Sequence, residues 1–291
     1  MTKTQLLIKK SVKGLFIIIT LSILTSGCTS LTTLLFYPKA HYYYTPANLG
    51  LNAEEVNITT SDGETLANWL LTSPVEPKGT ILFLHGNGEN ISTHILSVAW
   101  LPQQGYEVFL LDYRGYGKSS GTSLLPSALS DIKDAHRWLS DRAAKAERQT
   151  PLYVLGQSLG GALAITYTAN YPQDLVRINA LISESAPASW PQIAREAMRK
   201  HWLTWLLQLP ASLLPGEYDA EDHIAKITNI PILIMHSPDD FVVEYHHSQQ
   251  LIKSANGHAT LFTTAGPHIA GFKGKSGRKK FLDFLHESQK N

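Results

Sequence analysis

Short, wholly apolar segments recur along the chain, and turn residues separate them from longer stretches with helical periodicity. Segments such as TILFLH and PILIMH are typical of strands buried on both faces of a parallel sheet. The pattern predicts strands at 54–60, 65–72, 80–85, 107–112, 152–156, 179–184, 231–236 and 259–263, and helices at 92–104, 125–146, 159–170, 243–255 and 274–288. The first two strands flank Ser61-Asp62-Gly63 and are expected to form an antiparallel hairpin. The predicted fold class is α/β, with an eight-stranded, mostly parallel sheet flanked by helices.

Residues 187–225 interrupt this alternation. They contain Trp190, Trp202 and Trp205, together with the apolar run LTWLLQLPASLL. An insertion after the sixth strand predicts a short helical cap over the carboxyl ends of the strands. Its apolar side chains could receive an acyl chain or could simply pack on the domain, and the sequence leaves both readings open.

The amino terminus has a different composition. Four lysines and no acid precede the apolar stretch LFIIITLSIL at 15–24. About 20 apolar residues are needed to cross a bilayer, so this stretch is too short for a span but suits the core of a signal peptide. It ends in Thr25-Ser26-Gly27-Cys28, which resembles a bacterial lipobox, although Thr25 stands where leucine is usual. The resemblance implies that residues 1–27 are removed and that Cys28 is lipidated; the alternative is an uncleaved anchor with an incidental cysteine.

Cys28 is the only cysteine, so an intrachain disulfide is excluded. Loss of residues 1–27 removes four lysines and changes the net charge from +1 to −3, which removes the main support for a nucleic-acid partner. No zinc-type spacing of Cys and His is present, and we predict neither a metal nor a cofactor. Thr29 follows the cysteine where an aspartate would indicate retention at the inner membrane. We therefore expect a lipid-anchored protein of the bacterial cell envelope, at the outer membrane facing the periplasm.

A glycine-rich turn, Gly156-Gln157-Ser158-Leu159-Gly160-Gly161, follows the strand at 152–156. Glycines on both sides would let the backbone pass close to a strained serine that projects from the turn between strand and helix. Tight packing alone is the other explanation. A serine hydroxyl also needs a base, an acid that orients the base, and donors for the oxyanion.

Three more turns at the carboxyl ends of strands offer these groups. The turn His85-Gly86-Asn87-Gly88 can direct backbone N–H groups at the site, and the backbone amides of Asn87 and Leu159 are the natural oxyanion pair. The segment HSPDDFVV at 236–243 supplies either Asp239 or Asp240, and His268 follows the last strand as the base. The order Ser158, then the aspartate, then His268 is the order of an α/β-hydrolase triad.

The chain from about residue 36 to 288 resembles the α/β-hydrolase superfamily, and within it the small-capped serine hydrolases that border on serine aminopeptidases and monoacylglycerol lipases. The likeness is carried by LFYP at 35–38, TTSDGETLANWLL at 59–71, LHGNGEN at 84–90, DYRGYGKSSG at 112–121, GQSLGG at 156–161 and HSPDDFVV at 236–243. In these relatives the acid segment resembles H-G-x-x-D-x-x-V, which places the acid at Asp240 and leaves Ser237 in place of a glycine. The resemblance also implies His268 as the base and Asn87 and Leu159 as the oxyanion hole.

Several other polar residues have plainer explanations. The turn at 112–117 could contact substrate but is expected to be structural, and Glu184 is an alternative acid after the sixth strand. His246 and His247 are expected on the surface of a helix. The basic group at 273–280 is expected on a solvated helix face, or against anionic lipid.

The sequence as a whole divides into a signal peptide (1–27), a lipid-anchored tether (28–53) and a hydrolase domain (54–291) that contains the cap at 187–225. The leading hypothesis is a serine hydrolase that cleaves small-molecule or lipid esters and binds the membrane through Cys28. An aminopeptidase-type peptidase, a thioesterase and a non-catalytic envelope scaffold are the alternatives. The sequence does not indicate the oligomeric state.

Overall fold

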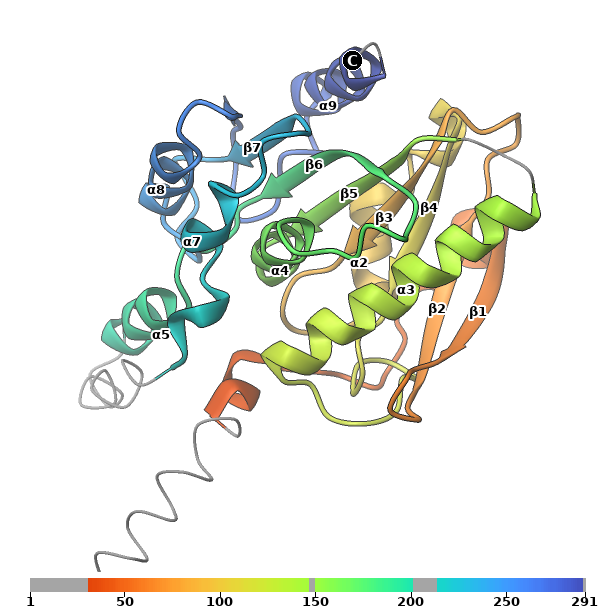
Figure 1. The fold of residues 1–291 in the computed structure, drawn as a ribbon, viewed down its shortest axis with the longest axis horizontal. Helices are drawn as coiled ribbons and strands as arrows, with labels where there is room; N and C mark the ends of the chain where they lie inside the picture. Colours follow the sequence, from red (N-terminus) through yellow and green to blue (C-terminus); the bar gives the residue numbers. More distant parts are fainter. Residues whose placement is uncertain (1–30, 147–149, 201–213, 290–291) are drawn as a thin grey trace, which may run out of the picture.

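A single sheet of eight strands organises the molecule (Figure 1). The computed structural model describes residues 31–146, 150–200 and 214–289. The strands are β1 (Ala53–Thr59), β2 (Thr65–Leu71), β3 (Gly79–Leu84), β4 (Tyr106–Leu111), β5 (Leu152–Gln157), β6 (Ile178–Glu184), β7 (Ile232–His236) and β8 (Ala259–Thr263), in the spatial order β1-β2-β4-β3-β5-β6-β7-β8. β2 runs antiparallel to β1 and β4, and the other pairs are parallel. The predicted hairpin and the predicted mostly parallel sheet are both confirmed.

Helices connect the parallel strands, and one more helix follows the last strand. They are α2 (Ile91–Val98), α3 (Leu125–Lys145), α4 (Leu159–Thr168), α5 (Trp190–Arg199), α7 (Ala220–Ile224), α8 (His246–Ser254) and α9 (Lys275–Ser288), with 3-10 turns η1 (Leu31–Leu35), η2 (Ala47–Leu49), η3 (Pro102–Gln104) and η5 (Gly216–Tyr218). The helix predicted at 92–104 was too long, because α2 ends at Val98 and a separate turn follows. Pro102 explains the break, since proline lacks the backbone N–H that a continuing helix needs.

Helices cover both faces of the sheet, so the alternating side chains of each central strand enter two separate cores (Figure 1). Leu82 and Leu84 of β3 pack with residues of α3, α4 and α8 on one face. Ile81 and Phe83 pack with residues of α2 and α9 on the other. This two-sided burial is why the central strands are apolar throughout rather than alternating with polar residues.

The insertion after β6 begins as a helix, as predicted. Trp190 opens α5 and is buried, where its ring N–H donates to the carbonyl of Tyr218 at 2.9 Å. The backbone N–H of Trp190 donates to Asp219 Oδ1 at 2.7 Å. Trp190 therefore joins the two ends of the insertion, and its role is in packing. Residues 201–213, with Trp202 and Trp205, lie outside the described residues.

The amino-terminal predictions also fall outside the described residues. Residues 1–30 contain the predicted signal peptide and Cys28. In the three described stretches of the chain, no helix has both the length and the apolar character that crossing a membrane requires.

The turn at 112–117 has the structural role expected of it. Arg114 is buried there and donates to Asp131 on α3, through Nε at 2.9 Å and Nη2 at 2.7 Å. It also donates to Asp62 in the β1–β2 turn, through Nη1 at 2.7 Å. One guanidinium thus joins the entry hairpin to α3 across the edge of the sheet.

Replacing Arg114 with alanine should lower the free energy of unfolding by about 3–5 kcal/mol, because Asp131 would be left buried without its guanidinium partner and would keep only the backbone N–H of residue 114. Urea titration of the parent and the variant measures this loss. The matched control is Arg137→Ala, since Arg137 and Asp174 form an exposed pair at 3.7 Å. The control should lose less than about 1 kcal/mol. Equal losses in the two variants would contradict the structural role of Arg114.

Candidate active site

The sharp turn between β5 and α4 places Ser158 at its apex. Ser158 has φ 54° and ψ −120°, a left-handed conformation that is rare for any residue but glycine. The backbone is crowded on both sides: a Cβ on Gly160 would lie 2.1 Å from the carbonyl oxygen of Leu84, and one on Gly156 would lie 2.2 Å from the carbonyl oxygen of Gly160. The glycines of this turn are therefore required by close packing of the helix against the strand ends.

Three side chains from separate loops form a hydrogen-bonded row. Nε2 of His268 lies 2.9 Å from Oγ of Ser158, and Nδ1 of His268 lies 2.7 Å from Oδ2 of Asp240. The Asp240 side chain is fully buried, whereas that of His268 is 17% exposed. Asp239, the other candidate acid, is exposed. The structure thus brings together the serine, the histidine and one of the two aspartates singled out in the sequence.

The loop after β7 holds Asp240 as an ionised carboxylate. Its Oδ1 accepts the backbone N–H groups of Val242 at 2.9 Å and Val243 at 3.1 Å, and Nε2 of His236 lies 3.3 Å from Oδ2. Burial alone would raise the pKa of Asp240, but its interactions with His236 and His268 outweigh burial and hold the pKa well below its usual range. A permanent negative charge is what an orienting acid needs in order to stabilise an imidazolium.

The two amides expected at the oxyanion position belong to Leu159, which follows Ser158, and to Asn87, which follows Gly86 in a loop that closely approaches Ser158. Leu159 is the first residue of α4, so its N–H has no acceptor within the helix. In the loop after β3, none of the hydrogen bonds formed by described residues uses the backbone N–H of Asn87. The Asn87 side chain is engaged elsewhere: it donates to the carbonyl of Leu35 at 2.7 Å and accepts from the N–H of Tyr37 at 2.8 Å.

Another histidine, His94, lies close to Ser158, and the sequence analysis did not identify it. His94 on α2 is buried, and its ring packs on that of His85 with centroids 5.2 Å apart. A Cβ on Gly86 would lie 3.2 Å from Cε1 of His94 and 3.3 Å from Cβ of Ser158. Burial, followed by the nearby His85, lowers the pKa of His94 to about 3, so the ring is neutral at pH 7. A single histidine in a helical pattern gives no signal that could have identified it.

Comparison with known proteins places this geometry in a family. The family model described as serine aminopeptidase, S33, matches residues 75–223. The chain belongs to this family of α/β hydrolases. YfhR of Escherichia coli K12 is 32% identical over 244 residues, which cover 80% of this chain and 81% of YfhR. Lysophosphatidylserine lipase ABHD12 of Danio rerio is 29% identical over 210 residues, covering 67% of this chain and 54% of that protein.

The esterase Pf2001 of Pyrococcus furiosus shares the fold, with a TM-score of 0.70 at 20% identity over 88% of this chain and 97% of that chain. Family and fold together make the protein an α/β-hydrolase enzyme, so the scaffold alternative is set aside.

Glu184 of this hydrolase is buried beneath the row of three side chains. Its carboxyl accepts the backbone N–H of Gly271 at 2.6 Å and the side-chain N–H of Gln157 at 2.6 Å, and its backbone carbonyl accepts the N–H of Ser158 at 2.8 Å. The carboxyl therefore joins the serine turn to the loop that carries His268 rather than bonding to His268 as an alternative acid. Burial raises the pKa of Glu184, which favours the neutral acid.

One group of side chains in the described part of the chain has the spacing that a metal ion needs. It consists of Glu196, His246 and His247, whose donor atoms lie within 4.8 Å of one another. The N–H of Ala188 donates to Nδ1 of His247 at 3.2 Å, which puts the ring proton on Nε2, facing Glu196 at 2.9 Å. His247 thus offers Glu196 a proton rather than a lone pair for a metal. The expectation that His247 lies on the surface was wrong: its side chain is fully buried, since α7 packs against α8 and Glu196 of α5 bonds to Nε2.

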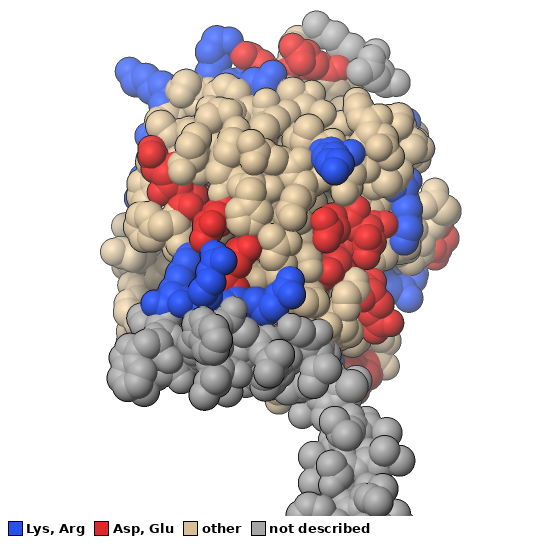
Figure 2. Space-filling model, turned by 90° about the vertical axis from the view of Figure 1, so that its left-hand side faces the viewer, with Lys and Arg blue, Asp and Glu red and all other residues tan. Residues whose placement is uncertain are grey.

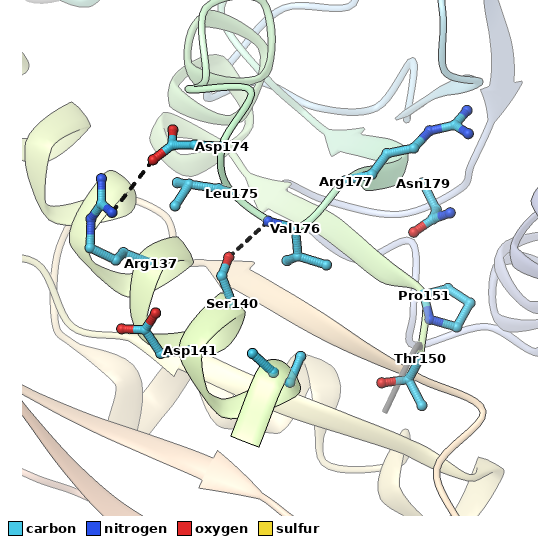
Figure 3. A pocket seen from close by; sticks show the side chains of 12 residues that line it. Arg137, Ser140, Asp141, Thr150, Pro151, Asp174, Leu175, Val176, Arg177 and Asn179 are labelled. Atoms are coloured by element: carbon cyan, nitrogen blue, oxygen red, sulfur yellow. Dashed lines mark hydrogen bonds and ion pairs between the residues drawn. The ribbon is translucent and has the colours of Figure 1, made fainter. Parts of the chain in front are cut away.

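A cavity of about 840 Å³ lies at the opposite end of the sheet, next to the residues that precede β5 and β6 (Figure 3). Arg137, Asp174, Arg177 and Asn179 line it, and the hydroxyl of Ser140 accepts the N–H of Val176 there at 2.9 Å. Parallel sheets bind ligands beyond the carboxyl ends of their strands, so this cavity is separate from the site at Ser158.

Removal of the Glu184 carboxyl should lower kcat by roughly 10-fold, because the buried N–H of Gly271 loses its acceptor, at a cost of about 1–3 kcal/mol, and the His268 loop loosens. The measurement compares Glu184→Ala with Glu184→Gln, in which an amide takes the place of the neutral acid. We expect kcat to fall with little change in KM in the alanine variant, and to recover in the glutamine variant. Full kcat in Glu184→Ala would contradict this.

Proposed function

We propose that this protein is a serine hydrolase that cleaves carboxylic esters through an acyl-enzyme on Ser158. The observation that carries the proposal is the hydrogen-bonded row from Ser158 through His268 to Asp240. In this scheme His268 removes the hydroxyl proton as Oγ attacks the ester carbonyl. Asp240 accepts a hydrogen bond from Nδ1–H of His268, which leaves the lone pair of Nε2 facing Oγ.

The negative charge that develops on the carbonyl oxygen would be stabilised by the backbone amides of Asn87 and Leu159. Each such donor typically contributes about 3–4 kcal/mol to transition-state stabilisation. His268 then gives its proton to the departing alkoxide, and the ester bond breaks. In the second half of the reaction, water loses a proton to His268, attacks the acyl-enzyme and releases the acid, and Ser158 regains its proton.

Ester cleavage is favoured over aminopeptidase action by the hydrogen bonding of the nearby carboxyls. An aminopeptidase needs an anionic group free to bind the substrate ammonium. Two carboxyls that contact the elements carrying Ser158 and His268, those of Asp240 and Glu184, are both committed to internal hydrogen bonds. The lipase named among the relatives supports an ester with an acyl chain as substrate.

Replacing Ser158 with alanine should lower turnover by roughly 10⁵-fold, because no other group would attack the carbonyl. The full chain, purified in detergent, is assayed on p-nitrophenyl esters from acetyl to palmitoyl and treated with a fluorophosphonate probe. The matched control is Ser183→Ala, since the buried Ser183 hydroxyl has no hydrogen-bond partner among the described residues. Labelling and hydrolysis that persist in Ser158→Ala would show that another residue is the nucleophile.

We also propose that the enzyme is anchored to the bacterial envelope by lipid on Cys28. The support is the basic, then apolar, then small-residue sequence that ends at this single cysteine.

In the producing bacterium, Cys28→Ser should lose incorporation of labelled palmitate and should leave the membrane fraction. Ser30→Ala, two residues away, is the matched control and should retain both. An unchanged lipid label in Cys28→Ser would refute the anchor while leaving the esterase proposal intact.

A further inference from the structure

The segment that follows Cys28 is bound to the loop that supplies the oxyanion amide. We call residues 35–44 the strap. Asn87 bonds to the strap at Leu35 and Tyr37, and the N–H of Lys39 donates to the carbonyl of Glu89 at 3.2 Å. The side chain of Asn90 donates to two further strap carbonyls, each at 2.7 Å. The strap is therefore part of the wall of the site rather than a loose linker.

The strap also fixes how far the site can lie from a lipid anchor. Two residues, Thr29 and Ser30, lie between Cys28 and Leu31, where the described chain begins. The distance is thus three residue steps, and an extended chain covers about 3.3–3.6 Å per step. The anchor point is therefore within about 10 Å of Leu31. The described chain starts at the end of the sheet toward which β5 and β6 run, which is the end that carries Ser158 (Figure 1).

Exposed apolar side chains gather at this same end. In the strap, Tyr37 is 62% exposed, and Tyr43 and Tyr44 are also exposed. On the other side of Ser158, Phe241 follows Asp240 directly and is 71% exposed, with Val242 exposed beside it. Tyrosine is enriched where protein meets the bilayer interface, and a phenylalanine this exposed is costly in water.

Basic residues lie beside the exposed Phe241 on this side of the molecule. Figure 2 shows the left-hand side of the molecule in Figure 1: uncharged residues cover much of it, acidic residues lie across its middle, and a group of Lys and Arg side chains lies below them. The helix α5 carries Arg195 and Arg199, and Nζ of Lys200 donates to the carbonyl of Phe241. Basic side chains next to the exposed Phe241 would meet the headgroups of anionic lipids.

We propose that the strap tyrosines and Phe241 form a rim that rests on the bilayer holding the Cys28 lipid, so that the site opens onto the membrane and takes lipid esters from it. This inference rests on the proposed esterase function and adds that the enzyme takes its substrate from the bilayer. The short reach from Cys28 makes the bilayer the occupant of the rim, since the anchor leaves little room for a protein in between.

The test places a probe on the rim of the full, acylated chain in vesicles of phosphatidylcholine and phosphatidylglycerol. Acylation of Cys28 uses the only thiol, so Phe241→Cys, Tyr37→Cys and Val75→Cys each carry one site for the fluorophore NBD. Val75 is the matched control: it is 60% exposed but lies between β2 and β3, at the opposite end of the sheet. We expect the emission of NBD at 241 and 37 to shift to the blue and to be quenched by nitroxide-labelled lipid, with no change at 75.

A second arm compares substrates. Phe241→Ser should hydrolyse an ester carried in the vesicle roughly 10-fold more slowly than the parent, because less apolar surface holds the rim in the bilayer. Its rate on soluble p-nitrophenyl acetate should be unchanged, and Val75→Ser should match the parent on both substrates.

Other results overturn the proposal. Probes at 241 and 37 that stay in water while p-nitrophenyl acetate is still hydrolysed would refute the rim but not the esterase. A blue shift at 241 without quenching by lipid, together with cross-linked dimers, would show that a second copy covers the rim. An unmodified Cys28 in the full chain would remove the tether on which the orientation depends.

Discussion

The packing of α4 against the carboxyl end of β3 is the constraint on which the rest of the site depends. Gly160 lies so close to the carbonyl of Leu84 that no side chain fits between them, and Ser158 is held in a left-handed conformation. Such a backbone costs about 1–3 kcal/mol and persists only where its surroundings fix it. Every residue of α4 is buried, so the packing of this helix offsets the strain. The same approach places the first amides of α4 beside the loop of Asn87.

The loops that carry Asp240 and His268 are each held in place by contacts outside the triad. The acid loop is closed by two backbone N–H groups on Asp240 and by His236, whose Nε2 donates to the carbonyl of Val243 at 2.9 Å. The histidine loop is held at Gly271, which lies between the Glu184 carboxyl and Gly277 of α9, with no space for a side chain on either glycine. The distances of 2.9 and 2.7 Å around His268 are thus set by groups outside the row.

The features of the fold and site that depend on local sequence pattern could be predicted from the sequence. Short strand patterns, wholly apolar in the centre of the sheet, located all eight strands, and turns after the later strands pointed to the residues that meet at the site. What the sequence did not reveal depends on contacts between distant segments. Glu184 was considered only as an acid, because nothing local shows that it reaches Gly271, 87 residues away. His247 was assigned to the surface, because nothing local shows that it is buried and bonds to Glu196, 51 residues away.

The strap links anchoring to catalysis through the Asn87 side chain. Its amide bonds to Leu35 and Tyr37 join segments about fifty residues apart, and its carbonyl also accepts the hydroxyl of Tyr116 at 2.9 Å. A chain without the strap would leave polar atoms of Asn87 unpaired at the edge of the site, and a turn that must hold a backbone amide in one direction would lose its support. The strap, which follows the anchor, therefore also supports the oxyanion loop, so displacement of the strap would move the loop.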